Sequence, residues 1–167
     1  MCVVKADAYG CGAVRVAQEL CGAGCTYLAV ACLSEAVELR RHKIAAPILI
    51  LGYTPPQLTP LLVRHRLTQT VFSAGYAQEI AEKVPAGEKL TVHLKAETGM
   101  HRLGMDTPEE LLRAAAYPQL AVEGIFTHFA VADGGPGDRV SQAYTEHQFE
   151  KFLALAGAVE RLSLIHI

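Results

Sequence analysis

Short apolar segments alternate along the chain with longer segments whose apolar residues recur with the period of a helix. The short segments predict six strands, at residues 2–6, 27–31, 48–51, 67–72, 90–94 and 122–126. The longer segments predict a helix after each strand, at residues 13–21, 34–42, 56–64, 74–84, 108–117 and 141–161. Because the strands are continuously apolar rather than alternating, the pattern predicts a parallel α/β sheet covered by helices.

Two of the predicted helices have recognisable N-terminal residues. Ser34 and Thr107 each stand at the start of a helical segment, and Thr107 is followed by Pro108, Glu109 and Glu110. A hydroxyl side chain at the N-cap, proline at the first helical position and acidic residues in the first turn all stabilise a helix start. We therefore expect Ser34 and Thr107 to cap these helices.

Two architectures contain such a sheet, an open doubly wound sheet and a closed (β/α)8 TIM barrel, and periodicity does not separate them. A barrel needs eight units and typically about 250 residues, whereas this chain of 167 residues supplies six predicted strands. A barrel would therefore be incomplete, with exposed strand edges that invite aggregation or pairing with another chain. We expect residues 1–161 to form this partial barrel, and residues 162–167 to be a non-native tail or the start of a seventh strand.

Composition narrows the function classes. With 51% hydrophobic residues, the chain has enough apolar material for a folded core. The 15 Lys and Arg residues against 17 Asp and Glu residues give a formal charge of −2, whereas nucleic-acid binders usually carry clustered positive charge. No apolar run approaches the roughly 20 residues of a membrane span, and the N-terminus does not resemble a secretory signal. We therefore expect a cytoplasmic protein with no nucleic-acid or membrane partner.

Five cysteines lie in the first 32 residues, at Cys2, Cys11, Cys21, Cys25 and Cys32. Their odd number and clustering argue against a disulfide framework. The spacing of Cys21 and Cys25 resembles half of a zinc site, but no second pair of Cys or His follows at ligand spacing. We therefore expect reduced, mostly buried thiols and no metal site.

A lysine, Lys5, lies at the end of the first predicted strand. The carboxyl ends of parallel strands are where active sites of such folds assemble. Burial there disfavours the charged ammonium, so that a lysine can supply a neutral amine for a Schiff base with an aldehyde. A lysine that merely reaches solvent is the commoner case, and position alone leaves both interpretations open.

Three motifs, taken in order, favour the catalytic interpretation. Residues 3–12 read VVKADAYGCG, residues 95–104 read KAETGMHRLG, and residues 124–133 read GIFTHFAVAD. The first closely resembles the pyridoxal-phosphate signature of bacterial alanine racemases, and the other two resemble further signatures of that family. The resemblance implies a fold-type III pyridoxal-phosphate enzyme, with an N-terminal (β/α)8 barrel and a mostly β C-terminal domain that this chain lacks.

The resemblance also implies roles for individual residues. Lys5 would form the internal aldimine with pyridoxal phosphate and act as one of two opposed catalytic bases, and the Tyr9 hydroxyl would contact the cofactor phosphate. Arg102 would bind the substrate carboxylate and the phenolic oxygen of the cofactor. His128 would form hydrogen bonds around the cofactor, although a core histidine is an equally good interpretation. Lys95 matches a lysine that often carries a carbamate, which requires a depressed pKa.

The resemblance places further parts of the site outside the chain. The second base is a tyrosine from the C-terminal domain of the partner subunit in a homodimer, and an arginine facing the pyridine nitrogen also lies in the missing portion. By resemblance, the intact protein interconverts L- and D-alanine for peptidoglycan precursor synthesis, by proton transfer at Cα of the external aldimine. We expect the isolated fragment to be inactive and to bind the cofactor weakly.

Departures from the family pattern leave alternatives open. Cys11 replaces the usual histidine and Glu97 the usual aspartate, and the longer Glu97 side chain would alter a hydrogen bond near Arg102. A serine or broad-specificity amino-acid racemase would share this site. A non-catalytic pyridoxal-phosphate-binding barrel would keep the lysine, but the motifs of Arg102 and His128 suit substrate handling. A plain structural module leaves all three motifs unexplained.

Overall fold

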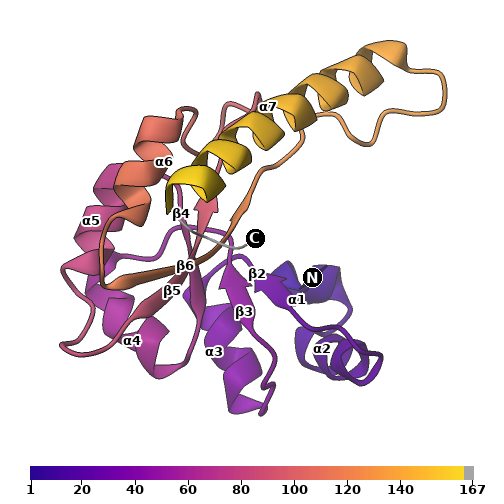
Figure 1. The fold of residues 1–167 in the computed structure, drawn as a ribbon. Coiled ribbons are helices and arrows are strands. Elements are labelled where there is room, and N and C mark those ends of the chain that lie inside the picture. The colour runs from indigo at the N-terminus through magenta and orange to yellow at the C-terminus, as the bar shows by residue number, and fades with distance from the viewer. Residues whose placement is uncertain (164–167) are drawn as a thin grey trace. The chain divides into compact units, whose positions relative to one another are not determined.

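The strands of the computed structural model, which describes residues 1–163, follow one another in the sheet in chain order (Figure 1). The six strands are β1 (Cys2–Val3), β2 (Leu28–Val30), β3 (Ile48–Ile50), β4 (Thr68–Val71), β5 (Leu90–Lys95) and β6 (Leu120–Phe126). The pairings from β1 to β4 are parallel. A doubly wound sheet reverses its strand order at a switch point, whereas a barrel does not. The order therefore confirms the prediction of an incomplete (β/α)8 barrel.

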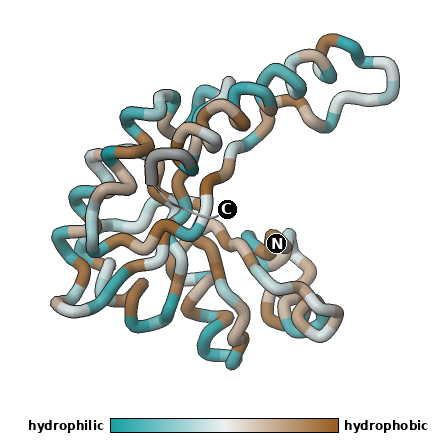
Figure 2. The backbone as a smooth tube through the Cα atoms, viewed as in Figure 1, coloured by the Kyte–Doolittle hydropathy of each residue, from teal (hydrophilic) through white to brown (hydrophobic). Residues whose placement is uncertain are grey.

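Helices separate the strands, as the sequence pattern predicts. They are α1 (Lys5–Gly10), α2 (Ala13–Gly22), α3 (Leu33–Arg41), η1 (Pro56–Leu58), α4 (Thr59–Arg64), α5 (Ala74–Ala81), α6 (Pro108–Ala115) and α7 (Arg139–Ser163). Figure 2 shows the underlying pattern as hydrophobic and hydrophilic segments that succeed one another along the backbone. The predicted helix at residues 56–64 is present but divides into η1 and α4.

The interior strands are buried on both faces, as continuous apolar strands should be. All three residues of β2 and all three of β3 are buried, and Leu28 lies opposite Ile48 in the parallel register. Burying one such Leu or Ile side chain contributes about 1.5–3 kcal/mol to folding. These strands therefore belong to the core, and loops emerge from it at their carboxyl ends.

One strand prediction and one cap prediction are wrong. The strand predicted at residues 2–6 ends at Val3, because the chain enters the turn α1 at Lys5. Thr107 caps α6 as predicted, with its hydroxyl accepting a hydrogen bond from the Glu110 N–H. Ser34 does not cap α3, because the helix begins at Leu33 and the Ser34 hydroxyl lies 3.1 Å from the Cys32 thiol.

The cysteines also differ from the prediction. All five are free, but four are half-buried and Cys11 is exposed, so that they are not mostly buried thiols. Within residues 1–163, no group of three or more His, Cys, Asp or Glu side chains is placed to hold a metal ion. Among the described helices, none combines the length and the apolar composition of a membrane span.

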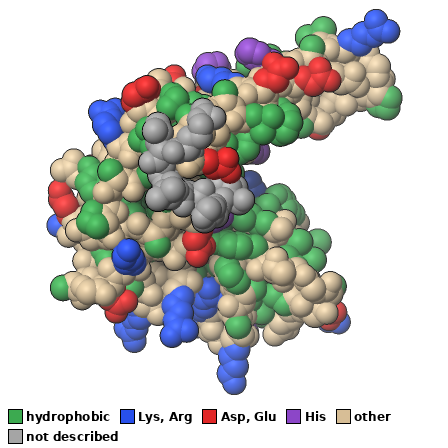
Figure 3. Space-filling view, in the orientation of Figure 1, with side chains coloured by type: hydrophobic (Ala, Val, Ile, Leu, Met, Phe, Trp, Pro, Cys, Tyr) green, Lys and Arg blue, Asp and Glu red, His purple; other side chains and the backbone are tan. Residues whose placement is uncertain are grey.

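The last helix, α7, carries charged, histidine and hydrophobic side chains on the face seen in Figure 3. Its exposed hydrophobic residues include Val140, Tyr144, Phe149 and Leu153. These fall into two pairs with helical spacing, but the step of five residues between the pairs rotates the second pair away from the first. Residues 164–167, on which the prediction of a tail or seventh strand chiefly falls, lie outside the described residues.

The structure divides into two compact units. The first contains Met1–Thr70, Glu79–Val92 and Pro118–Ala121, and the second contains Val71–Gln78, His93–Tyr117 and the chain from Val122 onward. The predicted site residues are distributed over both units. Lys5 and Tyr9 belong to the first, whereas Lys95, Arg102 and His128 belong to the second.

Candidate active site

Lys5 begins a left-handed helical turn directly after β1 and the buried Val4. The four residues from Ala6 to Tyr9 have φ between 51° and 57° and ψ between 35° and 51°. In L-residues this conformation costs roughly 1–2 kcal/mol per residue, because Cβ approaches the following carbonyl oxygen. A run of four non-glycine residues persists only when surrounding contacts hold it, and such strain clusters at functional sites.

Backbone hydrogen bonds and one carboxylate close this turn onto the next helix. The Ala8 N–H donates to the Val4 carbonyl at 3.0 Å, and the Gly12 N–H donates to the Asp7 carbonyl at 3.0 Å. The Asp7 carboxylate accepts from the Ala13 N–H at 2.6 Å, at the first residue of α2. Asp7 therefore satisfies an amide that the helix itself leaves unpaired at its N-terminus.

A second carboxylate, that of Glu35, anchors the other side of the turn. One oxygen accepts from the Ala6 N–H at 2.7 Å, and the other accepts from the Ala31 N–H at 2.7 Å. Both distances are at the short end of the range for N–H···O bonds, as is usual when the acceptor is charged. Glu35 lies in the first turn of α3. It therefore ties α3 both to the turn α1 and to the chain just after β2.

Besides Asp7, the turn presents two polar side chains. The Lys5 side chain is half-buried, and Tyr9 is 67% exposed. A Cβ built at the neighbouring Gly10 or Gly12 would meet no heavy atom within 4 Å. The turn thus offers a half-buried amine and an exposed hydroxyl, and the space around Gly10 and Gly12 is open.

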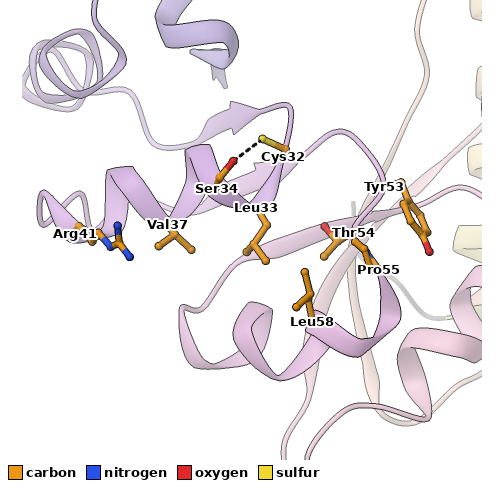
Figure 4. Close-up of a pocket in the computed structure, with 9 residues that line it drawn as sticks. All are labelled: Cys32, Leu33, Ser34, Val37, Arg41, Tyr53, Thr54, Pro55 and Leu58. Carbon is orange, nitrogen blue, oxygen red and sulfur yellow. Dashed lines mark hydrogen bonds between the residues drawn. The ribbon is translucent and has the colours of Figure 1, made fainter.

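A pocket of about 440 Å³ lies elsewhere in the first unit, between α3 and the segment that follows β3 as far as η1 (Figure 4). Its lining residues are Cys32, Leu33, Ser34, Val37, Arg41, Tyr53, Thr54, Pro55 and Leu58. Arg41 is the cation among them, and the residues of the turn α1 do not line it. The pocket is therefore distinct from the group formed by Lys5 and Tyr9.

In the second unit, Lys95 is buried at the end of β5, with 7% of its surface exposed. Its Nζ donates to the Ala96 carbonyl at 3.2 Å and lies 5.3 Å from the centre of the Phe126 ring. Burial lowers the pKa of Lys95 to about 8, with a contribution in the same direction from the charge of Arg102 and an opposing one from Glu97. The depressed pKa that a carbamate requires is therefore present.

Glu97 organises the loop that carries Arg102. Its carboxylate accepts hydrogen bonds from the Gly99 N–H and, at 3.4 Å, from the Arg102 N–H. Burial tends to raise the pKa of Glu97, but the amides of Gly99, His101, Arg102 and Met100 lower it, and the pKa lies below the ordinary value. The longer side chain that departs from the family pattern therefore meets the backbone of the Arg102 loop.

Two glycines allow this loop to close. Gly99 and Gly104 both have φ of 137°, which side-chain-bearing residues rarely adopt. A Cβ at Gly99 would lie 2.6 Å from the Tyr144 hydroxyl, which donates to the Gly99 carbonyl at 2.8 Å. A Cβ at Gly104 would lie 2.9 Å from the Glu97 nitrogen. Both positions of the motif therefore require glycine.

A chain of hydrogen bonds links the loop to α7. The buried Gln148 amide donates to the Thr98 hydroxyl at 3.3 Å, and the Thr98 and Thr127 hydroxyls are 2.8 Å apart. Thr127 donates to the Ala96 carbonyl at 3.0 Å. Because this uses the single Thr127 proton, Thr98 is the donor of the pair. Gln148 also accepts from the Ala130 N–H at 2.9 Å.

Arg102 and His128 are both exposed. His128 directly follows Thr127, and its exposure makes the interpretation as a core histidine wrong. The second unit therefore brings together the buried Lys95, the Arg102 loop and the segment that bears His128.

Sequence reasoning missed the residues that hold the site in place, namely Asp7, Glu35, Tyr144 and Gln148. Asp7 lies inside the first motif, so its presence there could have drawn attention to it. Glu35 is an acidic residue in a first helical turn, which is an ordinary helix-stabilising position and gives no signal of a distant partner. Gln148 is one polar residue on a helix with many.

Comparison with known proteins identifies the family. The family model described as alanine racemase, N-terminal domain, matches residues 1–167. The curated alanine racemase 1 of Oceanobacillus iheyensis is 43% identical over 164 residues, which is 96% of this chain and 43% of that protein.

Solved structures agree with this match. An alanine racemase of Clostridium difficile 630, in complex with cycloserine, superposes with a TM-score of 0.88 at 39% identity, over 96% of this chain and 44% of that one. A histidine racemase from Leuconostoc mesenteroides superposes with a TM-score of 0.81 at 30% identity, over 91% of this chain and 41% of that one. The chain spans less than half the length of these relatives. It belongs to the alanine racemase family and matches the N-terminal domain of that family.

Proposed function

We propose that this chain supplies the barrel part of a pyridoxal-phosphate-dependent amino-acid racemase, an isomerase that interconverts L- and D-alanine. The observation that carries the proposal is the turn α1, in which Lys5 directly precedes the four left-handed residues from Ala6 to Tyr9, within the motif that matches the family. Strain of this kind is retained where surrounding structure and function require it. The curated and solved alanine racemases support the choice of reaction.

The residues present suit the cofactor. The half-buried Lys5 amine would hold it covalently, with open space beside the turn, and the exposed Tyr9 hydroxyl would bind its phosphate. The exposed Arg102 guanidinium would bind the phenolic oxygen and the substrate carboxylate, and His128 would add a hydrogen bond. When bound, pyridoxal phosphate supplies an aldehyde that reacts with amines and a conjugated ring that accepts the electrons of a deprotonated carbon.

The chain's own part in the reaction is proton transfer on one face of the substrate. With the substrate amine in its place, the Lys5 amine is free to take the proton from the substrate Cα or to return it. Racemisation needs a second base on the opposite face, and we assign that base to the partner subunit of a homodimer. The isolated chain is therefore proposed to be inactive, and the intact protein to act in the cytoplasm, where D-alanine enters peptidoglycan precursors.

We further propose that Lys95 carries a carbamate. The pKa of about 8 leaves an appreciable fraction of the amine neutral near neutral pH. The ammonium first loses one proton, and the neutral nitrogen then adds to the carbon of carbon dioxide and loses a second proton, so that a positive group becomes a negative one. That anion would attract the Arg102 guanidinium, whose positive charge already contributes to the low pKa of Lys95. Carbon-13 NMR of the chain in labelled bicarbonate tests the adduct, with Lys95→Met as the control.

Two alternatives to an alanine racemase share residues of this site. The solved histidine racemase of Leuconostoc mesenteroides superposes on 91% of this chain, and this similarity favours a substrate range for this protein that is broader than alanine. A serine or broad-specificity racemase would share the residues described here, and a non-catalytic pyridoxal-phosphate-binding barrel would share Lys5. Turnover of the intact gene product with alanine, serine and histidine separates these candidates.

An absorbance titration tests cofactor binding. The purified chain is titrated with pyridoxal phosphate beside Lys5→Ala and Lys89→Ala, which removes an exposed lysine of the same unit. We expect a saturable band in the unaltered chain and in Lys89→Ala, and none in Lys5→Ala. A band that survives in Lys5→Ala would contradict the assignment of Lys5, and no band from a folded chain would assign cofactor binding to the intact protein alone.

A further inference from the structure

We propose that Glu35 is a positioning residue for Lys5, because its carboxylate sets the left-handed turn in which Lys5 stands. This inference rests on the proposed function, since the purpose of the turn is taken to be the presentation of Lys5 and Tyr9 to the cofactor. No motif of the sequence points to Glu35. It lies 29 residues from Ala6 in the chain, on a different helix.

The contact acts on the peptide that follows Lys5. The Ala6 N–H, which donates to Glu35 at 2.7 Å, belongs to the peptide bond between Lys5 and Ala6. Because that peptide is planar, fixing its N–H direction constrains ψ of Lys5 and φ of Ala6 together. Ala6 is the first left-handed residue of the turn, with φ of 51°. Glu35 therefore acts at the point where the chain leaves the strand direction.

The other carboxylate oxygen fixes the Glu35 side chain to the backbone next to β2. It accepts from the Ala31 N–H at 2.7 Å, directly after the fully buried strand β2. The Glu35 side chain thus relates the turn to the core of the first unit through two charge-assisted hydrogen bonds. The Asp7 carboxylate anchors the other end of the turn through the Ala13 N–H, whereas Ala6 and Tyr9 are exposed and only Ala8 is buried.

A carboxylate suits this position better than its neutral analogue. Two backbone N–H groups require two acceptor atoms, and an ionised carboxylate offers both oxygens. A glutamine offers one acceptor and an NH2 group, which would face one of the two N–H donors. An aspartate keeps the charge but is one methylene shorter, so that it cannot keep both contacts without a shift of the backbone.

The test compares three variants of the 167-residue chain. Glu35→Gln and Glu35→Asp change the contact, and Glu38→Gln removes the same charge from an exposed position on the same helix. The readouts are the equilibrium constant for the covalent adduct with pyridoxal phosphate, its induced circular dichroism, and hydrogen exchange of the Ala6 amide without cofactor. The melting temperature checks that each variant is folded.

We expect Glu35→Gln to weaken the adduct about tenfold and to speed exchange at Ala6 about tenfold, because it breaks a hydrogen bond to a charged group. The induced dichroism should fall as well, since it reports a fixed orientation that a change in stability alone does not alter. Glu35→Asp should show the same changes to a smaller extent, and it supplies the test if Glu35→Gln does not fold. Glu38→Gln should match the unaltered chain.

The outcomes separate this inference from the proposed function. If the folded, unaltered chain forms no adduct with pyridoxal phosphate, cofactor binding is assigned to the intact protein alone. Hydrogen exchange of the Ala6 amide then decides the inference, and unchanged exchange in Glu35→Gln overturns it. If the unaltered chain forms the adduct and folded Glu35→Gln or Glu35→Asp shows the same constant and dichroism, the inference alone is overturned. Equal effects of Glu38→Gln and Glu35→Gln would also overturn it, because they would show a general effect of charge on the helix.

Discussion

The buried Lys95 amine has a lowered pKa, which makes the free energy of unfolding depend on pH. The pKa is about 8 in the folded chain against an ordinary value of 10.5, chiefly because burial disfavours the charged form. Between these two values, the unfolded chain binds more protons at this site than the folded chain does. The unfolding free energy therefore rises with pH across that window. Below it, Lys95 is charged in the folded chain, and burial of that charge makes the fold less stable.

Replacing Lys95 by methionine should remove this dependence. The lowered pKa corresponds to at most about 3 kcal/mol of unfolding free energy. Lys95→Met should therefore be more stable than the unaltered chain below pH 8, and this difference should shrink by up to that amount as the pH rises to 10.5. Urea unfolding in bicarbonate-free buffer measures it, with the exposed Lys89→Met as the control. A stability difference that is the same at both ends of the window would contradict the placement of Lys95.

Glu97 should show the opposite dependence on pH. Burial tends to raise the pKa of Glu97, but the amides of the Arg102 loop lower it below 4.5. The ionised Glu97 therefore stabilises the fold above pH 4.5, and this stabilisation is lost as the pH falls through the pKa of the folded chain. Glu97→Gln should lack that loss, whereas the exposed Glu146→Gln should retain it. Unfolding measured in an acidic pH series checks this, and a parallel loss in Glu97→Gln and the unaltered chain would argue against the loop contacts.

Among the helices and turns, those set by neighbouring residues are predicted from the sequence, whereas one that depends on a distant contact is not. The start of α6 is predicted from Thr107 and the residues after it because a cap is a local interaction, and the structure confirms it. The turn α1 is not predicted, because alanine has no preference for positive φ and the contact with Glu35 spans 29 residues. A hydrophobic pattern reports burial and period but not the sign of φ, so Lys5 and Ala6 resemble the end of a strand.

Because α1 is left-handed, an alanine-to-glycine substitution there should affect the unfolding free energy differently from the same substitution in a right-handed helix. Ala6 is exposed in the left-handed turn, whereas Ala143 is exposed in the right-handed α7. Ala143→Gly should lower the unfolding free energy by about 1 kcal/mol. Ala6→Gly should leave it unchanged or raise it by up to about 1 kcal/mol, because relief of strain offsets the added freedom of the unfolded chain. Chemical denaturation measures both, and equal losses would contradict a left-handed turn.

The link between α7 and the Arg102 loop predicts a second pair of effects. Gln148→Leu leaves the buried contacts of the Ala130 N–H and the Thr98 hydroxyl unmade, which should destabilise the chain by about 1–3 kcal/mol. Gln142→Leu changes an exposed residue of the same helix and should stay within about 0.5 kcal/mol. If the two variants unfold at the same denaturant concentration, the network does not hold the loop.

For the whole molecule, the alternation of segments was sufficient to predict six units, and the consecutive strand order decides between the two architectures. The motifs singled out Lys5, Tyr9, Lys95, Arg102 and His128, and the comparisons confirm the family to which they belong. The anchoring contacts of Glu35 and Gln148 could not be predicted, because they join residues that are distant in the chain and carry no motif. Their positions depend on packing that a single sequence does not report.

The most direct test of the central claim asks which lysine reacts with the cofactor. The chain has six lysines, and Lys5 is proposed to hold pyridoxal phosphate while Lys95 is not. The purified chain is incubated with pyridoxal phosphate, reduced with borohydride, digested and analysed by mass spectrometry. The account predicts a label predominantly on Lys5. A label on Lys95, or one distributed evenly over the exposed lysines, would contradict it.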